Sequence, residues 1–374
     1  MVPTRRCFIY AGTLAALGLG AGMSRSNRVH AARLGPYGEI GAADLNGVRL
    51  PAGFTARLIG VTGEPVPGTS YDWHEAPDGG ATFAVPGGWV YVSNSESNGN
   101  TGGVSVIRFS SSGAIVNAYR ILSDTKWNCA GGATPWGTWL SCEEYRAGLV
   151  WECDPTGPGQ GIARPAMGKF VHEAAAVDPV SGYVYLTEDE DHGRFYRFRP
   201  AASGDLAAGV LEAAFVAAGG EVTWIAVPAT KPYRGSDTTP FARGEGAWFD
   251  AGRQAVFFTT TTDSRVWAFN TGTNVMAIVY DAANGGPLRE PDNVTVHAPS
   301  GQVFVAEDSD DLQLVLLSEE GGEWIASPFL QLEGHDSSEI AGPAFSPDGT
   351  RLYFSSQRGT DGKTGMTFEV TGPF

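Results

Sequence analysis

The stretch HEAAAVDPVSGYVYLTEDE, residues 172–190, decides the fold, because the chain carries close variants of it elsewhere. The clear copies are GEGAWFDAGRQAVFFTTTT at 244–262 and PDNVTVHAPSGQVFVAEDS at 291–309. The looser copies are NCAGGATPWGTWLSCEEY at 128–145, SEIAGPAFSPDGTRLYFSSQ at 338–357 and HEAPDGGATFAVPGGWVYVSNSE at 74–96. Each copy predicts two apolar strands joined by a tight turn. Because an antiparallel hairpin brings its two ends together, the polar residues at those ends meet at one rim.

Further strand-like segments follow the hairpins, such as 194–198 and 209–215. Six repeats of four strands predict an all-β fold, a six-bladed β-propeller. The last repeat ends at 366–370 and lacks one strand, whereas the strand-like residues 54–59 precede the first repeat. We therefore expect N- and C-terminal strands to pair and close the ring. Residues 32–374 are expected to form a single domain, with residues 200–240 as a loop over one face.

The first 31 residues have the features of a twin-arginine signal peptide. Arg5 and Arg6 precede a glycine- and alanine-rich apolar run, and Val29-His30-Ala31 resembles a cleavage site. The run is shorter than the roughly 18 residues that a membrane span needs, so we expect no stable membrane insertion. The twin-arginine export machinery is thus an expected partner, and the mature protein is expected in the periplasm or outside the cell. This route carries folded proteins, which favours a cofactor loaded before export.

Composition narrows the function classes. A net charge of −16 and a pI near 4.8 disfavour binding to nucleic acid. Removal of the signal would leave Cys129, Cys142 and Cys153, an odd number, so at least one is unpaired or a ligand. Whether Cys129 and Cys153 form a disulfide stays open. The chain carries neither the nucleophile elbow of serine hydrolases nor a phosphate-binding Gly-Lys-Ser/Thr loop.

Acidic residues occupy equivalent places in the repeats, and we expect them to bind metal. They are Glu173, Glu188 with the adjacent Asp189, Glu245, Asp292, Glu307 with the adjacent Asp308, and Glu339. Any one of them would more often cap a turn or pair with a surface cation, but converging carboxylates repel one another unless cations or raised pKa values offset the charge. Oxygen ligands suit Ca²⁺. Strand alternation places the Cys142 thiol and Glu144 on one face, and a thiolate beside a carboxylate suggests a transition metal.

Two other residues stand out beside these acids. Arg243 lies two positions before Glu245. It is either a salt-bridge partner or a bidentate clamp for an anionic group such as phosphate. His172 directly precedes Glu173 and is expected to face the opposite way, as a structural residue.

In the motifs around these residues, the chain resembles the PhoX-type alkaline phosphatases. The resemblance covers most of the mature chain. It rests on Asn128–Gly132, Thr134–Thr138, Cys142-Glu143-Glu144, His172-Glu173, Arg243-Xaa-Glu245, Pro291-Asp292-Asn293, Glu307-Asp308, Glu339–Pro343 and Phe345–Gly349. It implies hydrolysis of small phosphomonoester substrates by a cluster of iron and calcium ions in a central channel. It further implies that Cys142 and Glu144 bind iron, that Glu173 and Glu245 bind metal, and that Arg243 contacts phosphate in catalysis.

Two other functions remain open at this point, and both use central carboxylates. One is a calcium-dependent lactonase-like hydrolase, and the other is a non-catalytic propeller whose calcium ions are structural. Stoichiometric iron, or a metal–thiolate absorption lost in Cys142→Ala, would argue against the lactonase. The non-catalytic propeller predicts that Arg243→Ala leaves every assay unchanged, whereas Glu173→Ala mainly lowers the melting temperature. The protein is expected to be a monomer.

Overall fold

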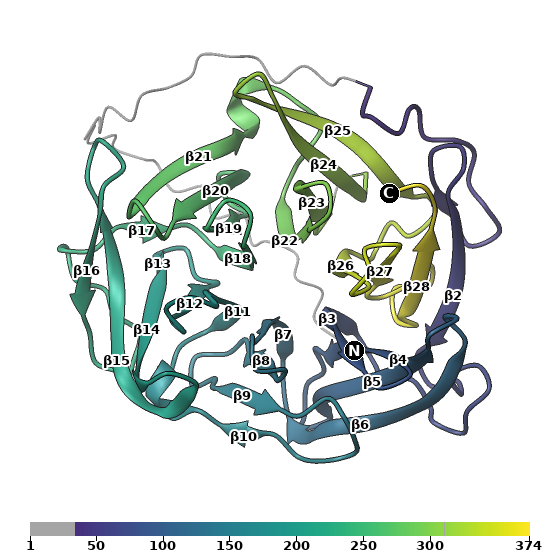
Figure 1. Ribbon diagram of the computed structural model, residues 1–374, viewed down its shortest axis with the longest axis horizontal. Helices are drawn as coiled ribbons and strands as arrows, with labels where there is room; N and C mark the ends of the chain where they lie inside the picture. Colours follow the sequence, from purple (N-terminus) through teal and green to yellow (C-terminus); the bar gives the residue numbers. More distant parts are fainter. Residues whose placement is uncertain (1–33, 310) are drawn as a thin grey trace.

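The computed structural model describes residues 34–309 and 311–374, so the predicted signal peptide lies outside the described residues. Six sheets stand around a central axis, each with its first strand innermost (Figure 1). The prediction of an all-β six-bladed propeller is confirmed. In the described part of the chain, no helix is long and apolar enough to cross a membrane.

The strands of the first three blades run outward from the axis in chain order. Blade 1 contains β3 (Pro77–Val85), β4 (Gly88–Ser95), β5 (Gly102–Ser110) and β6 (Ile115–Thr125). Blade 2 contains β7 (Asn128–Ala133), β8 (Trp139–Glu143), β9 (Val150–Cys153) and β10 (Ile162–Ala163). Blade 3 contains β11 (His172–Val177), β12 (Val184–Glu188), β14 (Tyr196–Ala202), β15 (Asp205–Val216) and β16 (Val222–Ala226).

The other blades include the N-terminal strands. Blade 4 contains β18 (Gly244–Asp250), β19 (Ala255–Thr260), β20 (Arg265–Asn270) and β21 (Val275–Asp281). Blade 5 contains β22 (Pro291–His297), β23 (Gln302–Glu307), β24 (Gln313–Glu320), β25 (Glu323–Leu332) and β1 (Val48–Arg49). Blade 6 contains β26 (Ile340–Phe345), β27 (Arg351–Ser356), β28 (Met366–Thr371) and β2 (Thr55–Val61). The remaining elements are β13 (Gly193–Arg194), β17 (Pro240–Phe241) and the 3₁₀ turns η1 (Pro165–Met167) and η2 (Ala282–Asn284).

The ring closes as expected, because β2 pairs antiparallel with β28 and completes blade 6. The purple N-terminal strand lies beside the yellow C-terminal one in Figure 1. Residues 200–240 differ in part from the expected loop, since β15, which contains the strand-like residues 209–215, and β16 extend blade 3 outward. The part that remains irregular, 227–239, is tied to blade 3 by the bidentate salt bridge of Arg234 to Glu188.

Apolar side chains fill the spaces between neighbouring blades. One cluster joins blades 3 and 4 through stacked rings, with Phe195 and Phe258 centroids 4.3 Å apart. Another joins blades 5 and 6 and includes Phe304 and Phe354. Burial of these faces holds the blades around the axis, and edge-to-face and offset ring contacts add to it.

The innermost strand of each blade is interrupted by a β-bulge close to its start. In β11, for example, His172 pairs with Glu188 and Ala175 pairs with Leu186, so Glu173 and Ala174 together oppose one residue. The same irregularity recurs in β3, β7, β18 and β22, and β26 has it one position later. Since a bulge changes the direction of the side chains beside it, the propeller repeats one device for turning a residue toward its axis.

Candidate metal centre

The residues at the bulges form a first ring around the axis. It comprises Asp78, Cys129, Glu173, Glu245 and Asp292, from β3, β7, β11, β18 and β22. All five are buried. The corresponding residue of blade 6 is Ala341, so one side of the ring carries no ionisable group.

A second ring comes from the residue that follows the second strand of each blade. Its members are Glu96, Glu144, Asp189, Thr261, Asp308 and Gln357. Each backbone N–H donates to the carbonyl of the residue just before the innermost strand, as Glu144 does to Trp127 and Asp308 to Glu290. This shared hydrogen bond holds each second-ring residue beside its first-ring neighbour.

Three groups within the rings bring potential metal ligands within 4.8 Å of one another. They are Asp78, Glu96 and Cys129; then Cys129, Glu144 and Glu173; then Glu173, Glu245 and Asp292. Cys129 belongs to the first two groups and Glu173 to the last two. The groups therefore form a connected series in which the thiol and one carboxylate lie between neighbouring sites.

Hydrogen bonds fix part of this series. The Cys129 thiol donates to Glu173 Oε1 over 3.0 Å and lies 3.5 Å from Asp78 Oδ2. Gln357 donates from Nε2 to both Asp78 and Glu96. The second oxygen of Glu173, Oε2, is buried and has no hydrogen-bond partner in the described chain. A buried, unpartnered carboxylate oxygen is costly unless a cation or a proton occupies it.

The first-ring carboxylates perturb one another. Burial raises the pKa of Glu173 well above its usual value, and the charges of Glu245, Glu144, Asp292 and Asp78 raise it further. Asp78, Glu245 and Asp292 have pKa values raised in the same way, by burial first and then by neighbouring carboxylates. Burial also raises the pKa of the Cys129 thiol. Four such groups side by side form a strong site for cations.

Arg243 lies at the edge of this acidic channel, where it precedes β18. Its guanidinium donates to Asp189 and forms an ion pair with Glu245 Oε1 at 2.8 Å. Burial alone would lower its pKa, but the charges of Glu245 and Asp189 raise it, so the group stays cationic. Its backbone has a φ of 54°, in the left-handed region that non-glycine residues seldom occupy. Such a conformation at a candidate site is a strained feature that the surrounding contacts maintain.

The structure places the predicted residues unequally. It brings Glu144, Glu173, Glu245 and Asp292 into the three groups, whereas Cys142, Glu188 and Glu307 are in none of them. Glu339 is buried at the start of blade 6 and pairs with Arg358 at 2.8 Å.

Cys142 is fully buried in the apolar core with Leu140 and Val150. The expected alternation with Glu144 fails because β8 ends at Glu143, so Glu144 leaves the strand and turns to the axis. Cys129 is the thiol among the carboxylates instead. Cys129, Cys142 and Cys153 are all free, so no disulfide joins Cys129 to Cys153.

Glu188 and Glu307 turn into their own blades. Glu188 accepts hydrogen bonds from Arg234 and Tyr196. Glu307 accepts from the backbone N–H groups of Arg289 and Gln313, and burial raises its pKa to about 9. The residues that follow them, Asp189 and Asp308, belong to the second ring.

Sequence reasoning also missed Asp78 and Cys129 as candidate ligands, although the repeats contain the signal. Aligned on their first strands, PDGGA, NCAGG, HEAAA, GEGAW and PDNVT place these two residues in the column of Glu173, Glu245 and Asp292. His172 stacks on Phe170, with ring centroids 3.6 Å apart, and burial lowers its pKa to about 3. It is a neutral core residue, as its position before Glu173 predicts.

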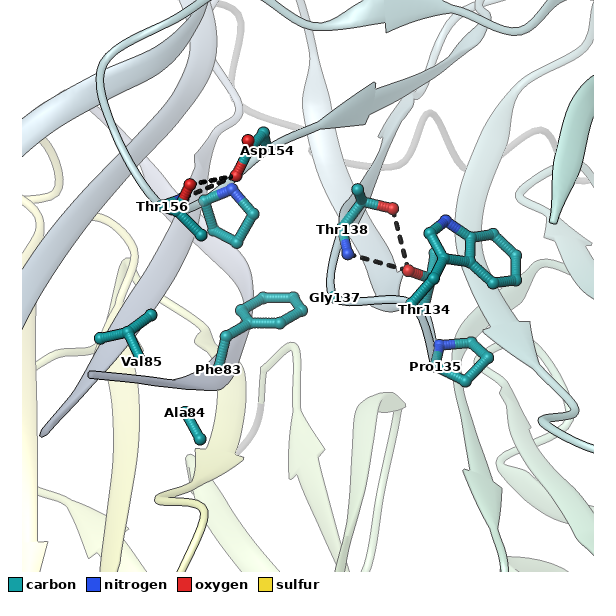
Figure 2. A pocket seen from close by; sticks show the side chains of 11 residues that line it. Phe83, Ala84, Val85, Thr134, Pro135, Gly137, Thr138, Asp154 and Thr156 are labelled. Carbon is teal, nitrogen blue, oxygen red and sulfur yellow. Dashed lines mark hydrogen bonds between the residues drawn. The ribbon is translucent and has the colours of Figure 1, made fainter.

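A separate hollow of about 420 Å³ lies between blades 1 and 2. Figure 2 shows Phe83, Thr134 and Thr138 on its walls, with Asp154 and Thr156 bonded to each other at its edge. It is formed by the ends of β3 and β9 and by the β7–β8 turn. The acids lie at the opposite ends of these hairpins, so this hollow is not part of the metal centre.

Fold and site together define a β-propeller whose axis is lined by buried carboxylates and one thiol. The family model of alkaline phosphatase PhoX matches residues 75–149 and 145–274, more than half of the chain. The chain belongs to the PhoX alkaline phosphatase family and is thus a phosphomonoesterase.

Solved structures agree on the fold. Pseudomonas fluorescens PhoX in complex with vanadate, a transition state analogue, is 17% identical with a TM-score of 0.73, covering 88% of this chain and 97% of that one. A gluconolactonase from Xanthomonas campestris is 13% identical with a TM-score of 0.56, covering 91% of this chain and 100% of that one. At these identities the likeness is one of fold. No curated protein matches the chain.

Proposed function

We propose that this chain hydrolyses phosphomonoesters at metal ions bound by the two rings in the channel. The observation that carries the proposal is the connected series of buried groups around Cys129 and Glu173. Without cations, four buried carboxylates with raised pKa values and the unpartnered Glu173 Oε2 would only destabilise the fold. Metal ions would account for both features.

The donor atoms suit two kinds of metal. The groups that share Cys129 offer a soft sulfur with carboxylates, a set that fits iron. The group of Glu173, Glu245 and Asp292 offers oxygen only and fits calcium. Bound ions would supply Lewis-acid polarisation of the phosphoryl oxygens and offset their charge. A lactonase that binds calcium alone would not explain why a thiol lies between the carboxylates, because calcium takes oxygen ligands.

The chain itself contributes charge and orientation. Arg243 is held by Asp189 and Glu245, and 28% of its side chain remains exposed at the edge of the channel. Its Nε and Nη2 groups already donate to these two carboxylates, whereas its Nη1 group has no such partner among the described residues and can donate to phosphoryl oxygens. The carboxylate contacts fix its direction before substrate arrives, so little reorganisation is needed as charge develops on those oxygens.

The sharpest test compares two adjacent glutamates. Glu144 faces Cys129 and Glu173, whereas Glu143 turns away and accepts from the backbone of Leu149. Glu144→Gln should lower the amount of bound iron. It should also lower the rate of p-nitrophenyl phosphate hydrolysis by at least about 100-fold, a loss similar to that caused by removing one group that stabilises a transition state. Glu143→Gln should retain both. Metal content is measured by elemental analysis of protein exported by its own route. Wild-type protein that binds iron and calcium yet hydrolyses no phosphomonoester would contradict the proposal.

Export and assembly state belong to the same proposal. Residues 1–31 would direct the folded, metal-loaded chain through the twin-arginine machinery to the periplasm or beyond, where it would act as a monomer. Replacement of Arg5 and Arg6 by lysine should retain the protein in the cytoplasm. Cell fractionation checks where the protein is found, and light scattering of the exported protein checks that it is a monomer.

A further inference from the structure

Blade 6 carries a second arginine at the channel. Arg358 directly follows Gln357 of the second ring, and its Nη1 forms an ion pair with Glu339 Oε2 at 2.8 Å. Its backbone N–H donates to Ser338 Oγ, which in turn is bonded to Ser356 Oγ. The side chain is 31% exposed, close to the 28% of Arg243. Arg358 is thus a fixed, partly accessible cation at the channel.

The two arginines flank the same sector of the channel. Arg243 belongs to blade 4 and Arg358 to blade 6, on either side of blade 5. For both guanidiniums burial lowers the pKa and carboxylates raise it, first Glu245 for Arg243 and Glu339 for Arg358. Asp308, the second-ring residue of blade 5, acts on both of them more weakly. Glu96 of blade 1 also raises the pKa of Arg358, after Glu339. Arg358 therefore faces the rings rather than the outside of the blade.

The two blades that carry these arginines, blades 4 and 6, contribute the fewest acids to the rings. Blade 6 contributes Ala341 to the first ring and Gln357 to the second, and blade 4 contributes Thr261 to the second. The candidate metal groups draw on blades 1 to 5 and include no residue of blade 6 among those described. Within residues 34–309 and 311–374, no acceptor bonds to the Arg358 Nε or Nη2 groups. Those donors point to a ligand with several acceptor oxygens.

We propose that Arg358 binds the phosphoryl group of the substrate from the blade 6 side, in addition to Arg243 on the blade 4 side, with Glu339 orienting it. The inference rests on the proposed function and adds to it a specific substrate contact. Two guanidiniums around one phosphoryl group match the two negative charges of a phosphomonoester, and a diester carries only one. The opposing explanation is that Arg358 only neutralises the buried Glu339.

The test separates these two roles by inhibition with inorganic phosphate. In Arg358→Gln at wild-type metal content, the phosphate Ki and the KM for p-nitrophenyl phosphate should both rise about 10- to 100-fold, as expected for loss of a charged hydrogen bond. In Arg358→Gln with Glu339→Gln, the carboxylate that Arg358 pairs with is removed as well, yet the Ki should stay raised. A Ki that returns to the wild-type value in this double variant would overturn the inference.

Two controls complete the design. Arg351 lies on β27 of the same blade and pairs with Glu369 at 2.7 Å, away from the rings, so Arg351→Gln should leave the phosphate Ki unchanged. Arg358→Lys keeps the charge and should fold if Arg358→Gln does not, with a smaller rise in Ki because lysine has no planar fork. A wild-type Ki in Arg358→Lys at full metal content would also count against a phosphate contact through the fork. Wild-type protein that neither hydrolyses the substrate nor binds phosphate would instead refute the proposed function itself.

Discussion

Cys129 and Cys142 lie in the same blade, but their surroundings predict opposite effects of substitution. Cys129→Ala removes the thiol shared by two candidate metal groups, so bound iron and phosphatase activity should be lost. Cys142→Ala removes a sulfur from an apolar core and should lower the free energy of unfolding by about 1 kcal/mol, with metal content retained. Elemental analysis and urea denaturation of the two variants measure these effects. Iron lost from the Cys142 variant alone would assign the thiolate ligand to Cys142.

At this scale the sequence identifies the right kinds of residue better than the right positions. Alternation along a strand predicts side-chain direction only while the strand is regular, and each first-ring residue lies at a bulge. Glu144, Asp189 and Asp308 lie just past a strand end, where alternation no longer applies. Glu188 and Asp189 are both acidic, and their hydrogen-bond partners on distant segments decide which one faces the axis.

The innermost strands of neighbouring blades approach so closely that some positions accept only glycine. A Cβ on Gly132 of β7 would lie 1.6 Å from the carbonyl oxygen of Ala175 on β11. Because backbone must move to relieve this overlap, Gly132→Ala should lower the free energy of unfolding by about 3 kcal/mol. Gly157→Ala is the matched control, since a Cβ there meets no atom within 4 Å. Equal denaturation midpoints for the two variants would refute the close approach of β7 and β11.

The strands themselves are largely readable from the sequence. Each hairpin combines an apolar period of two with a glycine-containing turn, and both signals are local. The missing fourth strand of the last repeat predicts that β2 pairs with β28, because an open propeller would leave an unpaired edge. In blade 3, the strand-like residues 209–215 are confirmed as part of β15. The strand β16 was not predictable, since its residues are mostly partly exposed and pairing with β15 stabilises them. Residues 227–239 likewise depend on one long-range ion pair, Arg234 with Glu188.

Across the whole molecule, the six blades repeat the backbone but differ in charge. Blades 1, 2, 3 and 5 place an ionisable residue in both rings, whereas blade 4 has Thr261 and blade 6 has Ala341 and Gln357. Arg243 and Arg358 belong to these last two blades. The two arginines thus lie in the blades with the fewest ring acids, on either side of the acidic blade 5. The proposed hydrolysis at metal ions needs cation-binding and anion-binding groups next to each other, and the six blades supply positions at which these groups can differ.

This charge distribution predicts how stability depends on pH and metal. In the metal-free protein, Asp78, Glu173, Glu245 and Asp292 have raised pKa values, and that of Glu307 is raised to about 9. As pH rises above the pKa of the unfolded chain, the unfolded state releases these protons before the folded state does. Each group that keeps its proton longer in the folded state then lowers the free energy of unfolding as the pH rises, until its folded pKa is passed. The melting temperature of chelator-treated protein should thus fall steadily from pH 5.5 to pH 9.

Bound metal should oppose this fall in melting temperature, because cations bind the deprotonated carboxylates and offset their mutual repulsion. The gap between metal-loaded and metal-free melting temperatures should therefore widen as pH rises, since ligand binding stabilises the folded state in proportion to its affinity. Thermal unfolding followed by circular dichroism, with iron and calcium or with chelator, measures both curves. If the channel carboxylates were paired within the protein and needed no cation, the two curves would run parallel from pH 5.5 to pH 9.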